Sequence, residues 1–324
     1  MSDPARARAS AGAWAACLAL GLAAATAAAA AGAPAFDDAF WKQWGDGRAE
    51  LAGYDLTVPR YGALRHGVAV TIFVTETFAN DLRVKADPGV HPKSDEFPAI
   101  KLNLVQDFPT GIYDYNLMTS AFVALAPVNG RPAGAPTKVS FSSQEWCGNV
   151  YSQLRFDAGG RAALVSHSYF DREADRGETL DVPADAVAED ALLLWARGLA
   201  APALAPGESA VAPLVRSLRE SRLLHRAEDL ERVTLRRSAQ PERVTVPAGT
   251  FDADVYTAAV AGDRTWTFWI ERAGPHRVLR WTASDGEDAR LLASDRLRYW
   301  EMHDPGGEAA LAKLGLRPRG ERMP

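Results

Sequence analysis

One stretch of the chain constrains the fold more than any other, because residues 68–78, VAVTIFVTETF, alternate between two kinds of side chain. The larger aliphatic residues are Val68, Val70, Ile72 and Val74, and alanine or threonine lies between most of them. Successive side chains of a β-strand point to opposite faces, so this period of two predicts a strand with one face in a core. The chain is therefore expected to bury a sheet.

Similar alternation recurs along the rest of the chain. Residues 99–108 and 112–125 are two such runs, separated by a break at Pro109-Thr110-Gly111, and two strands joined by so short a turn pair antiparallel. Further strands are expected at 244–246, 251–259, 264–271, 277–283 and 290–300. Helix-spaced apolar residues predict one helix near 185–198. We therefore predict a mainly β fold, a curved antiparallel sheet or half-barrel with minor helix.

The first 35 residues have the pattern of a secretory leader. Arg6 and Arg8 precede an alanine- and leucine-rich stretch over residues 11–31, and a region of small residues ends at Ala35. This pattern is typical of a cleaved signal peptide and predicts an exported, periplasmic protein. The stretch is also long enough to span a bilayer, so an uncleaved N-terminal anchor stays open as an alternative.

The remaining sequence divides where its composition and hydrophobic periodicity change. We predict a signal peptide at 1–35, an N-terminal β-rich region at 36–201, a C-terminal β-rich region at 202–304 and a C-terminal tail at 305–324. The proline- and glycine-rich stretch at 202–213 could be a linker between two β domains or the crossing loop of a single sheet. The two β-rich regions could therefore also be one continuous domain.

Charge and cysteine content exclude some classes of partner and structure. The formal net charge is −5 at pH 7 and stays negative without residues 1–35, so we expect no nucleic-acid partner. After residue 35 the chain has one cysteine, Cys147, which excludes an intrachain disulfide. In an oxidising compartment the fold must then be held by packing alone.

Four stretches together resemble a family of exported bacterial proteins. They are FWKQWGDGRAELAGYDLTVPRYG at 40–62, DFPTGIYDYNLMTSAF at 107–122, SFSSQEWCGNVY at 140–151 and VPAGTFDADVYT at 246–257. Members of this family are often labelled septum formation inhibitor Maf. True Maf proteins are cytoplasmic nucleotide pyrophosphatases, and this sequence has neither their motifs nor their compartment, so we do not adopt that label.

Separately, the C-terminal half is similar to a periplasmic domain family of unknown function. The similarity rests on VPAGTF at 246–251, WTFWIE at 266–271 and PHRVLRW at 275–281. Such domains resemble lipoprotein-localisation carriers in forming a curved antiparallel sheet. The resemblance implies an open half-barrel that could cover an apolar ligand, and it implies no catalytic residues.

One candidate site for chemistry lies at a predicted hairpin tip. If residues 148–149 form a two-residue type II′ turn, Cys147 faces Val150 and shares a strand face with Glu145. The next strand, folded back, would place His167 beside Val150. A histidine and a carboxylate near a thiol could activate a thiolate. We favour the alternative, a structural hairpin, because a register slip of one residue would send Glu145 and His167 to the other face.

Other ionisable residues point to no specific site. The remaining histidines lack zinc-ligand spacing, so we expect no metal and no cofactor. Asp107, Asp114, Glu76 and Glu96 could supply a carboxylate pair for hydrolysis, although the sequence fixes no distance between them. A basic run at Arg216, Arg219, Arg222 and Arg226 is interrupted by Glu220, Glu228, Asp229 and Glu231, which predicts a solvated face of mixed charge.

Aromatic residues suggest a place for an apolar ligand. Trp266, Phe268 and Ile270 share one face of a predicted strand, and Tyr113 and Tyr115 lie on another. A β half-barrel lined in this way could hold an acyl chain, since ligand sites are concave and largely apolar. The alternative is that these residues pack the core and leave no space.

These patterns favour a non-enzymatic protein of the cell envelope. The leading hypothesis is a protein that binds an apolar, lipid-like molecule or acts as an envelope assembly factor. One alternative is an exported hydrolase that uses Cys147, His167 and Glu145 or a carboxylate pair. Another is a structural partner of a second envelope protein, with the aromatic surface as its interface.

Overall fold

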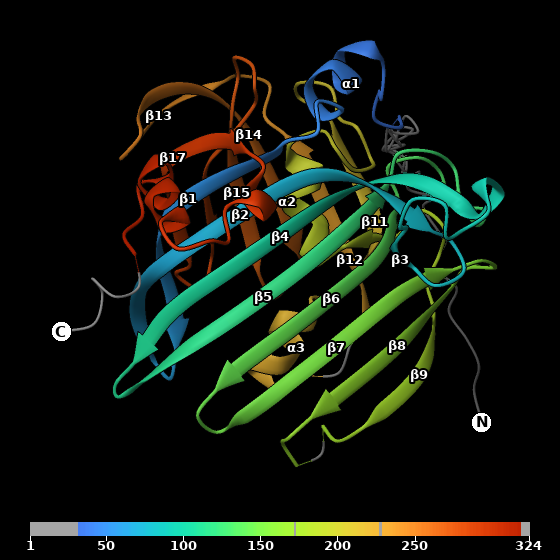
Figure 1. Ribbon diagram of the computed structural model, residues 1–324, viewed down its shortest axis with the longest axis horizontal. Coiled ribbons are helices and arrows are strands. Elements are labelled where there is room, and N and C mark those ends of the chain that lie inside the picture. The colour runs from blue at the N-terminus through green and yellow to red at the C-terminus, as the bar shows by residue number, and fades with distance from the viewer. Residues whose placement is uncertain (1–31, 172, 227–228, 319–324) are drawn as a thin grey trace, which may run out of the picture. The chain divides into compact units, whose positions relative to one another are not determined.

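Seventeen strands pair into one sheet in the computed structural model, which describes residues 32–171, 173–226 and 229–318 (Figure 1). The predicted mainly β fold is confirmed. The predicted signal peptide at 1–35 lies almost wholly outside the described residues, and cleavage and export stay predictions. Within the described residues, no helix is both long and apolar enough to cross a membrane.

The first half of the sheet is an antiparallel wall in which each strand pairs with the next. Its strands are β1 (Ala49–Arg60), β2 (Ala63–Ala79), β4 (Glu96–Thr110), β5 (Tyr113–Ala124), β6 (Pro136–Glu145), β7 (Gly148–Asp157), β8 (Arg161–Ser168) and β9 (Arg176–Asp181). The short strand β3 (Val84–Lys85) pairs with the end of β2, and η1 (Lys93–Asp95) precedes β4. The predicted hairpin is confirmed as β4–β5, which pair from Ala99 with Ala124 to Thr110 with Tyr113.

The second half continues the same sheet, because β1 also pairs with β17. Its strands are β17 (Asp288–Leu297), β16 (Val278–Ala283), β15 (Thr265–Glu271), β14 (Gly249–Val260), β13 (Glu242–Val246), β12 (Leu230–Arg237), β11 (Ser209–Val215) and β10 (Val187–Ala188). The pairing of β10 with β11 is parallel. Among the described residues β9 and β10 do not pair, so the sheet stays unclosed.

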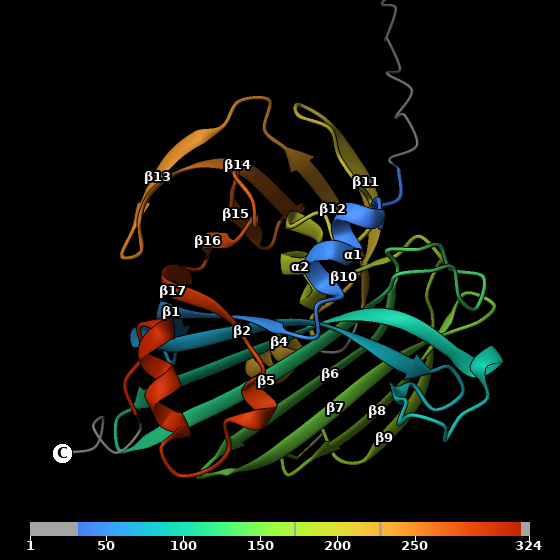
Figure 2. The same ribbon diagram turned by 45° about the horizontal axis from the view of Figure 1, so that its top comes forward.

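Short helices pack on both faces of the curved sheet. They are α1 (Asp38–Trp44), η2 (Glu189–Ala191), α2 (Leu192–Ala196), α3 (Leu218–Leu224), η3 (Tyr299–Glu301) and η4 (Gly307–Leu314). Of these, η2, α2 and α3 lie inside the sheet, whereas η3 and η4 lie on its outer face. Figure 2 shows α2 between the two walls of the sheet, and α3 packs on the inner face of β6. The helix predicted at 185–198 is shorter than expected, because Val187 and Ala188 extend the sheet beside β11.

The core lies between the sheet and these inner helices. Every side chain of α2 is buried, and the indole of Trp195 makes edge contacts with Tyr256 and Phe268. The Trp195 Nε1 donates to the carbonyl oxygen of Pro202 at 2.9 Å, which satisfies its polar atom in the core. The enclosed space is therefore occupied by the chain itself.

Strand β2 buries side chains on both faces. Ala69 and Phe73 point into the main core. The aliphatic residues Val68, Val70 and Ile72 lie on the outer face, where Leu314 of the C-terminal segment packs against them. The alternation predicted the strand, but its larger aliphatic residues face a second, smaller core.

The predicted boundary between the two β-rich regions, at 201/202, lies after α2. The strands before and after this boundary belong to one sheet, because β1 pairs with β17. The proline- and glycine-rich stretch at 202–213 follows α2 and includes the first residues of β11. The four segments proposed from the sequence stay predictions.

Candidate functional site

The β6–β7 hairpin has a different turn from the predicted one. Glu145 pairs with Gly148, so the turn residues are Trp146 and Cys147 rather than 148–149. Gly148 is needed for another reason, because a Cβ there would lie 2.5 Å from the Tyr169 ring. Close approach of an aromatic ring, and not turn geometry, accounts for this glycine. Cys147 is consequently exposed at the tip of the hairpin.

The structure does not bring together Cys147, Glu145 and His167, the residues of the predicted thiolate site. His167 pairs with Tyr151 and lies on the outer face, where its Nδ1 is 2.9 Å from the Asp175 carboxylate. Relative to the predicted pairing, β8 is shifted by one residue, which reverses the face of every side chain on the strand. Glu145 points inward and its carboxylate pairs with Arg222 at 2.9 Å. A thiol, a base and an acid therefore do not meet at Cys147.

The two predicted ligand-binding tyrosines belong to a hydrogen-bonded cluster. Tyr115 is fully buried, and its hydroxyl is 2.6 Å from that of Tyr61 and accepts from Arg60 at 2.8 Å. Burial raises the pKa of Tyr115 above its ordinary value. Tyr113 is half-buried and stacks on Trp146 with ring centroids 6.1 Å apart. The hydroxyl of Tyr115 is therefore already occupied by protein partners.

The other three predicted ligand-binding residues pack into the core. Trp266, Phe268 and Ile270 share the inner face of β15, as expected from the alternation, and all three are buried. The rings of Trp266 and Phe268 are nearly parallel, with centroids 6.2 Å apart. The cavity beside these two rings measures about 40 Å³, room for about three water molecules. An acyl chain does not fit there.

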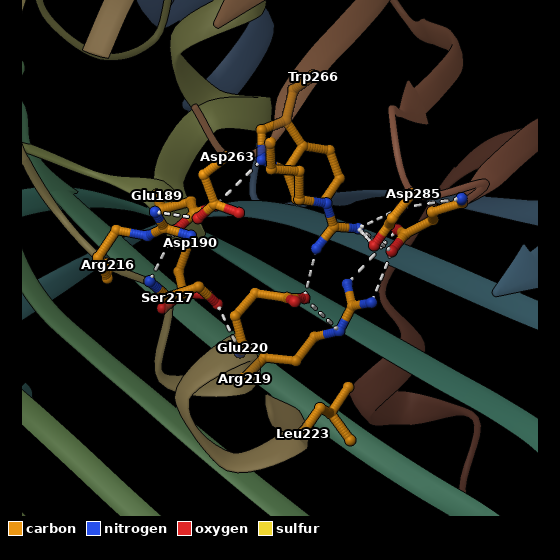
Figure 3. Close-up of polar contacts among 12 residues, drawn as sticks. Glu189, Asp190, Arg216, Ser217, Arg219, Glu220, Leu223, Asp263, Trp266 and Asp285 are labelled. Carbon is orange, nitrogen blue, oxygen red and sulfur yellow. Dashed lines mark hydrogen bonds and ion pairs between the residues drawn. The ribbon is translucent and has the colours of Figure 1, made fainter. Parts of the chain in front are cut away.

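This cavity is bordered by a group of charged residues, which we call the inner ion cluster (Figure 3). Its six members are all less than a tenth exposed, and they are Glu189, Arg216, Arg219, Glu220, Arg264 and Glu287. Three arginines thus meet three glutamates, and their formal charges cancel. The predicted solvated face of mixed charge is wrong for Arg216, Arg219, Glu220 and Arg222, because α3 lies inside the sheet.

Arg219 and Arg264 share their carboxylate partners. Arg219 Nη2 lies 2.6 Å from Glu287, and Arg264 contacts Glu287 at 3.0 Å and Glu220 at 2.6 Å. Burial alone would raise the pKa of Glu287, but the charges of the two arginines lower it to about 2. Trp281 Nε1 also donates to Glu287 at 2.8 Å. Because Arg219 and Glu220 belong to α3, these ion pairs fix the helix to the turns that precede β15 and β17.

A second group of contacts fixes the start of α3. Arg216 Nε donates to Glu189 at 2.9 Å, and Trp266 Nε1 donates to the other oxygen of the same carboxylate at 3.1 Å. Asp190 accepts from the Ser217 hydroxyl at 2.6 Å and from the Leu218 backbone N–H at 3.0 Å. These acceptors satisfy N–H groups that the first turn of a helix leaves free.

Asp190, next to the inner ion cluster, has a pKa near neutrality. The residue keeps some exposed surface, but its carboxyl group is surrounded by protein. Burial raises the pKa to about 7, and the hydrogen bonds from Ser217 and Leu218 only partly oppose this effect. The Ser217 hydroxyl donates to Asp190 and accepts from the Glu220 N–H, so it is engaged as the helix cap. These contacts describe an anchor for α3 rather than a nucleophile with its base.

Two of the predicted carboxylate candidates, Glu76 and Asp107, lie far apart. Across β2 and β4, Glu76 pairs with Ala99 whereas Asp107 pairs with Val68. These positions are eight residues apart on β2, or about 27 Å at the rise of a strand. Glu76 contacts Lys101. Within the described part of the chain, no group of three or more His, Cys, Asp or Glu side chains could hold a metal ion.

A larger apolar space lies on the outer face of the sheet. This cavity, the C-terminal groove, measures about 400 Å³ and lies between η4 and the paired strands β1 and β17. Its lining is mainly aliphatic and aromatic, with Leu51, Leu297, Tyr299, Met302, Ala310, Leu311 and Leu314, and its polar members are His303, Asp304 and Glu308. Sequence reasoning assigned residues 305–324 to a tail and missed this space.

Close packing fixes the floor of the groove. A Cβ on Gly53 of β1 would lie 2.2 Å from the carbonyl oxygen of Leu314, so only glycine lets the C-terminal segment lie so close to the strand. The β1–β17 pairing also shifts register between Gly53 and Tyr54. Gly315 follows η4 with a φ of +68°, a conformation that favours glycine. Leucines spaced along η4 could have indicated this docking, since Leu311 and Leu314 share one face.

No protein-family model matches this chain, and no curated protein matches it. Among solved structures, the chain is similar to a β-barrel-like protein of domain of unknown function DUF1849 from Brucella abortus. The sequence identity is 11%, the TM-score is 0.44, and the match covers 78% of this chain and 98% of that chain. A likeness of this degree transfers no residue or activity. The resemblance to the exported family labelled Maf and the relation to lipoprotein carriers stay predictions.

Proposed function

We propose that this protein is a non-enzymatic binding protein of the cell envelope that holds an aliphatic chain in the C-terminal groove. The envelope location rests on the secretory pattern of residues 1–35. The observation that carries the proposal is the groove of about 400 Å³ with its apolar lining. This volume falls within the range of sites that bury small ligands.

The lining suits a flexible hydrocarbon. Leu51 and Leu297 form the strand side, and Leu311 and Leu314 form the side of η4. Met302 adds an unbranched, polarisable side chain that can adapt to irregular apolar shapes. His303, Asp304 and Glu308, also in the lining, could receive a polar head group that donates hydrogen bonds. An amphipathic molecule with one aliphatic chain matches this distribution.

The interior cavity that borders the predicted ligand-binding residues of β15 is much smaller. The cavity beside Trp266 and Phe268 is about a tenth as large and is bordered by the inner ion cluster. The cysteine version of the hydrolase alternative lacks its geometry as well, because Cys147 has neither Glu145 nor His167 as a neighbour able to activate it. The groove is therefore the best-supported place for a ligand.

Binding of N-phenyl-1-naphthylamine, a neutral apolar dye that fluoresces in apolar sites, tests the proposal. We expect the wild-type protein to bind the dye and a long-chain aliphatic alcohol to displace it. In the Ala310→Trp variant the new side chain fills the groove. If the new side chain displaces apolar ligand surface equal to only two methylene groups, about 1.6 kcal/mol of binding free energy is lost. The dissociation constant of the dye should therefore rise about tenfold or more.

The matched control is Val211→Trp, which adds the same side chain at an exposed position of β11. This variant should bind the dye as the wild type does. Native mass spectrometry of protein purified from its own envelope should also show a bound lipid-like molecule. Absence of dye binding by the wild type, or equal binding by Ala310→Trp, would rule out the groove as the site.

A further inference from the structure

The C-terminal groove has a polar end and an apolar end. Glu308, Leu311 and Leu314 line it from η4 and follow one another at intervals of three residues. Side chains with this spacing lie almost above one another in a 3₁₀-helix, and its rise separates Glu308 from Leu314 by about 12 Å. Glu308 is exposed, Leu311 is half-buried and Leu314 is buried. A single-chain amphiphile in the groove would therefore place its head group near Glu308 and its tail near Leu314.

The polar side chains at this end are hydrogen-bond acceptors. His303 Nδ1 lies 2.9 Å from the carbonyl oxygen of Trp300, which can only accept, so Nδ1 holds the proton. The Nε2 of a neutral His303, 3.9 Å from the Asp304 carboxylate, is then an acceptor as well. The carboxylates of Asp304 and Glu308 accept without donating, and the Gly306 N–H donates to one Glu308 oxygen at 2.8 Å. This end of the groove therefore suits a head group that donates hydrogen bonds.

The negative charge at this end is not balanced within the groove. Among the described residues that line the groove, none is lysine or arginine, and Arg317, which follows η4, is not part of the lining. The lysine and arginine residues of segment 295–314 pair with acids outside the lining, Arg296 with Asp46 at 2.7 Å, Arg298 with Glu301 at 3.5 Å and Lys313 with Asp295 at 3.4 Å. The other two acids of this segment, Asp304 and Glu308, both line the groove. A bound head group therefore meets two carboxylates.

We propose that the C-terminal groove selects an amphiphile whose head group is a protonated amine. This inference rests on the proposed function, in which the groove holds the aliphatic chain. An alkylammonium group has up to three N–H donors and a positive charge, which complement the acceptors and the two carboxylates. A carboxylate head group, as in a fatty acid, has acceptors only and would lie beside two like charges. The groove thus distinguishes head groups, while its apolar walls hold either tail.

Competition among three ligands with the same tail tests this preference. Decylamine, decanol and decanoate, each below its micelle concentration, compete with bound N-phenyl-1-naphthylamine at pH 8 and low ionic strength. An alkylamine is charged at this pH, whereas the imidazole of a histidine is mostly neutral. Low ionic strength limits the screening of exposed carboxylates. We expect decylamine to displace the dye at a concentration at least about fivefold lower than decanoate, because the two carboxylates attract one head group and repel the other.

The double variant Asp304→Asn and Glu308→Gln removes both charges and keeps the size of the side chains. The ratio of the displacing concentrations of decanoate and decylamine should fall to about twofold or less. The matched control is Glu301→Gln, which removes an acid of the same segment that pairs with Arg298 and lies outside the lining. This control should keep the wild-type ratio. Circular dichroism checks that each variant is folded, and the comparison of ligands in the wild type needs no variant.

The outcomes separate the head-group preference from the proposed function. If decanol displaces the dye but decylamine is no better than decanoate, the head-group preference is overturned and the groove still holds an aliphatic chain. A ratio that is unchanged in the double variant overturns the assignment of the preference to Asp304 and Glu308. Failure of decanol to displace the dye from the wild type overturns the proposed function, and the head-group preference with it.

Discussion

Replacing Glu287 by Gln tests what the inner ion cluster contributes to the fold. Glu287 is 1% exposed. One of its oxygens accepts from Arg219 and Arg264, and the other accepts from Trp281 and, at 3.4 Å, from Arg219 as well. Glutamine has the same shape and can still accept from the Trp281 Nε1. The change therefore removes a negative charge while the packing stays close to that of the wild type. Arg219 and Arg264 lose a shared counter-charge in a buried environment.

Two independent estimates give the size of the effect. Removing one partner of a buried ion pair costs about 3–5 kcal/mol, because the other charge is left uncompensated. The pKa of Glu287 is about 2, compared with an ordinary value of 4.5. A difference of about 2.5 in pKa corresponds to about 3 kcal/mol of stabilisation of the charged form. We therefore expect Glu287→Gln to lower the free energy of unfolding by about 3 kcal/mol at pH 7.

Urea unfolding across a pH series is the assay. The folded-state pKa of Glu287 is lowered, so its contribution is present above about pH 4.5 and is lost as the pH falls toward 2. Glutamine does not titrate. The gap in unfolding free energy between wild type and variant should therefore be largest at neutral pH and should close in acid. Tryptophan fluorescence can follow the transition, since Trp281 is a direct neighbour.

Asp285→Asn is the matched control. Asp285 also contacts Arg264, at 3.1 Å, but its side chain is 39% exposed. An ion pair that reaches solvent contributes at most about 1 kcal/mol, so this variant should remain close to the wild type. Equal losses in the two variants would refute the reasoning, because burial would then not matter. The reasoning would also be refuted if the difference in unfolding free energy between wild type and Glu287→Gln did not change with pH.

Two further variants test neighbouring features. Burial raises the pKa of Asp190 to about 7, so the folded protein holds a proton that the unfolded chain releases between about pH 4 and pH 7. Urea unfolding should therefore show that the wild type loses a few kcal/mol of unfolding free energy relative to Asp190→Asn as the pH rises through this range. A wild type that gains stability relative to the variant as the pH rises would contradict the burial of this carboxyl group. Gly148→Ala should lower the unfolding free energy by about 1–3 kcal/mol, because the added Cβ would lie 2.5 Å from the Tyr169 ring. Gly177→Ala is the control, because no atom lies within 4 Å of a Cβ added there, and it should change the unfolding free energy little. Equal losses in the two variants would refute the close packing of Tyr169 against Gly148.

The local pattern of the sequence was enough to predict most of the sheet. The β4–β5 hairpin follows from two alternating runs and a short break, because both pairing and register are decided by nearby residues. The β6–β7 register was missed for the opposite reason. Gly148 looks like a turn residue, yet its role depends on Tyr169, which lies about twenty residues further along the chain. A glycine has several uses, and its sequence neighbours do not distinguish them.

The inner ion cluster shows a stronger limit of sequence reasoning. Arg216, Arg219 and Arg222 lie three residues apart, a spacing that places them on neighbouring positions of a helix face. Nearby acidic residues made a solvated face the natural interpretation. Their true partners include Glu145 and Glu287, which are 77 and 68 residues away from the arginines they contact. Only the fold shows that the arginine side of α3 points inward.

These buried charges also bear on where a ligand can bind. To open a ligand-sized space beside Trp266 and Phe268, α3 would have to move away from β15 and β17. That movement would separate Arg219 from Glu287 and Glu220 from Arg264 in a poorly solvated interior, where each unpaired ion costs several kcal/mol. An apolar chain has no charge with which to compensate for these losses. The C-terminal groove requires no such separation, because its apolar walls are already apart. The same arginines that keep the interior closed therefore favour a binding site outside the sheet.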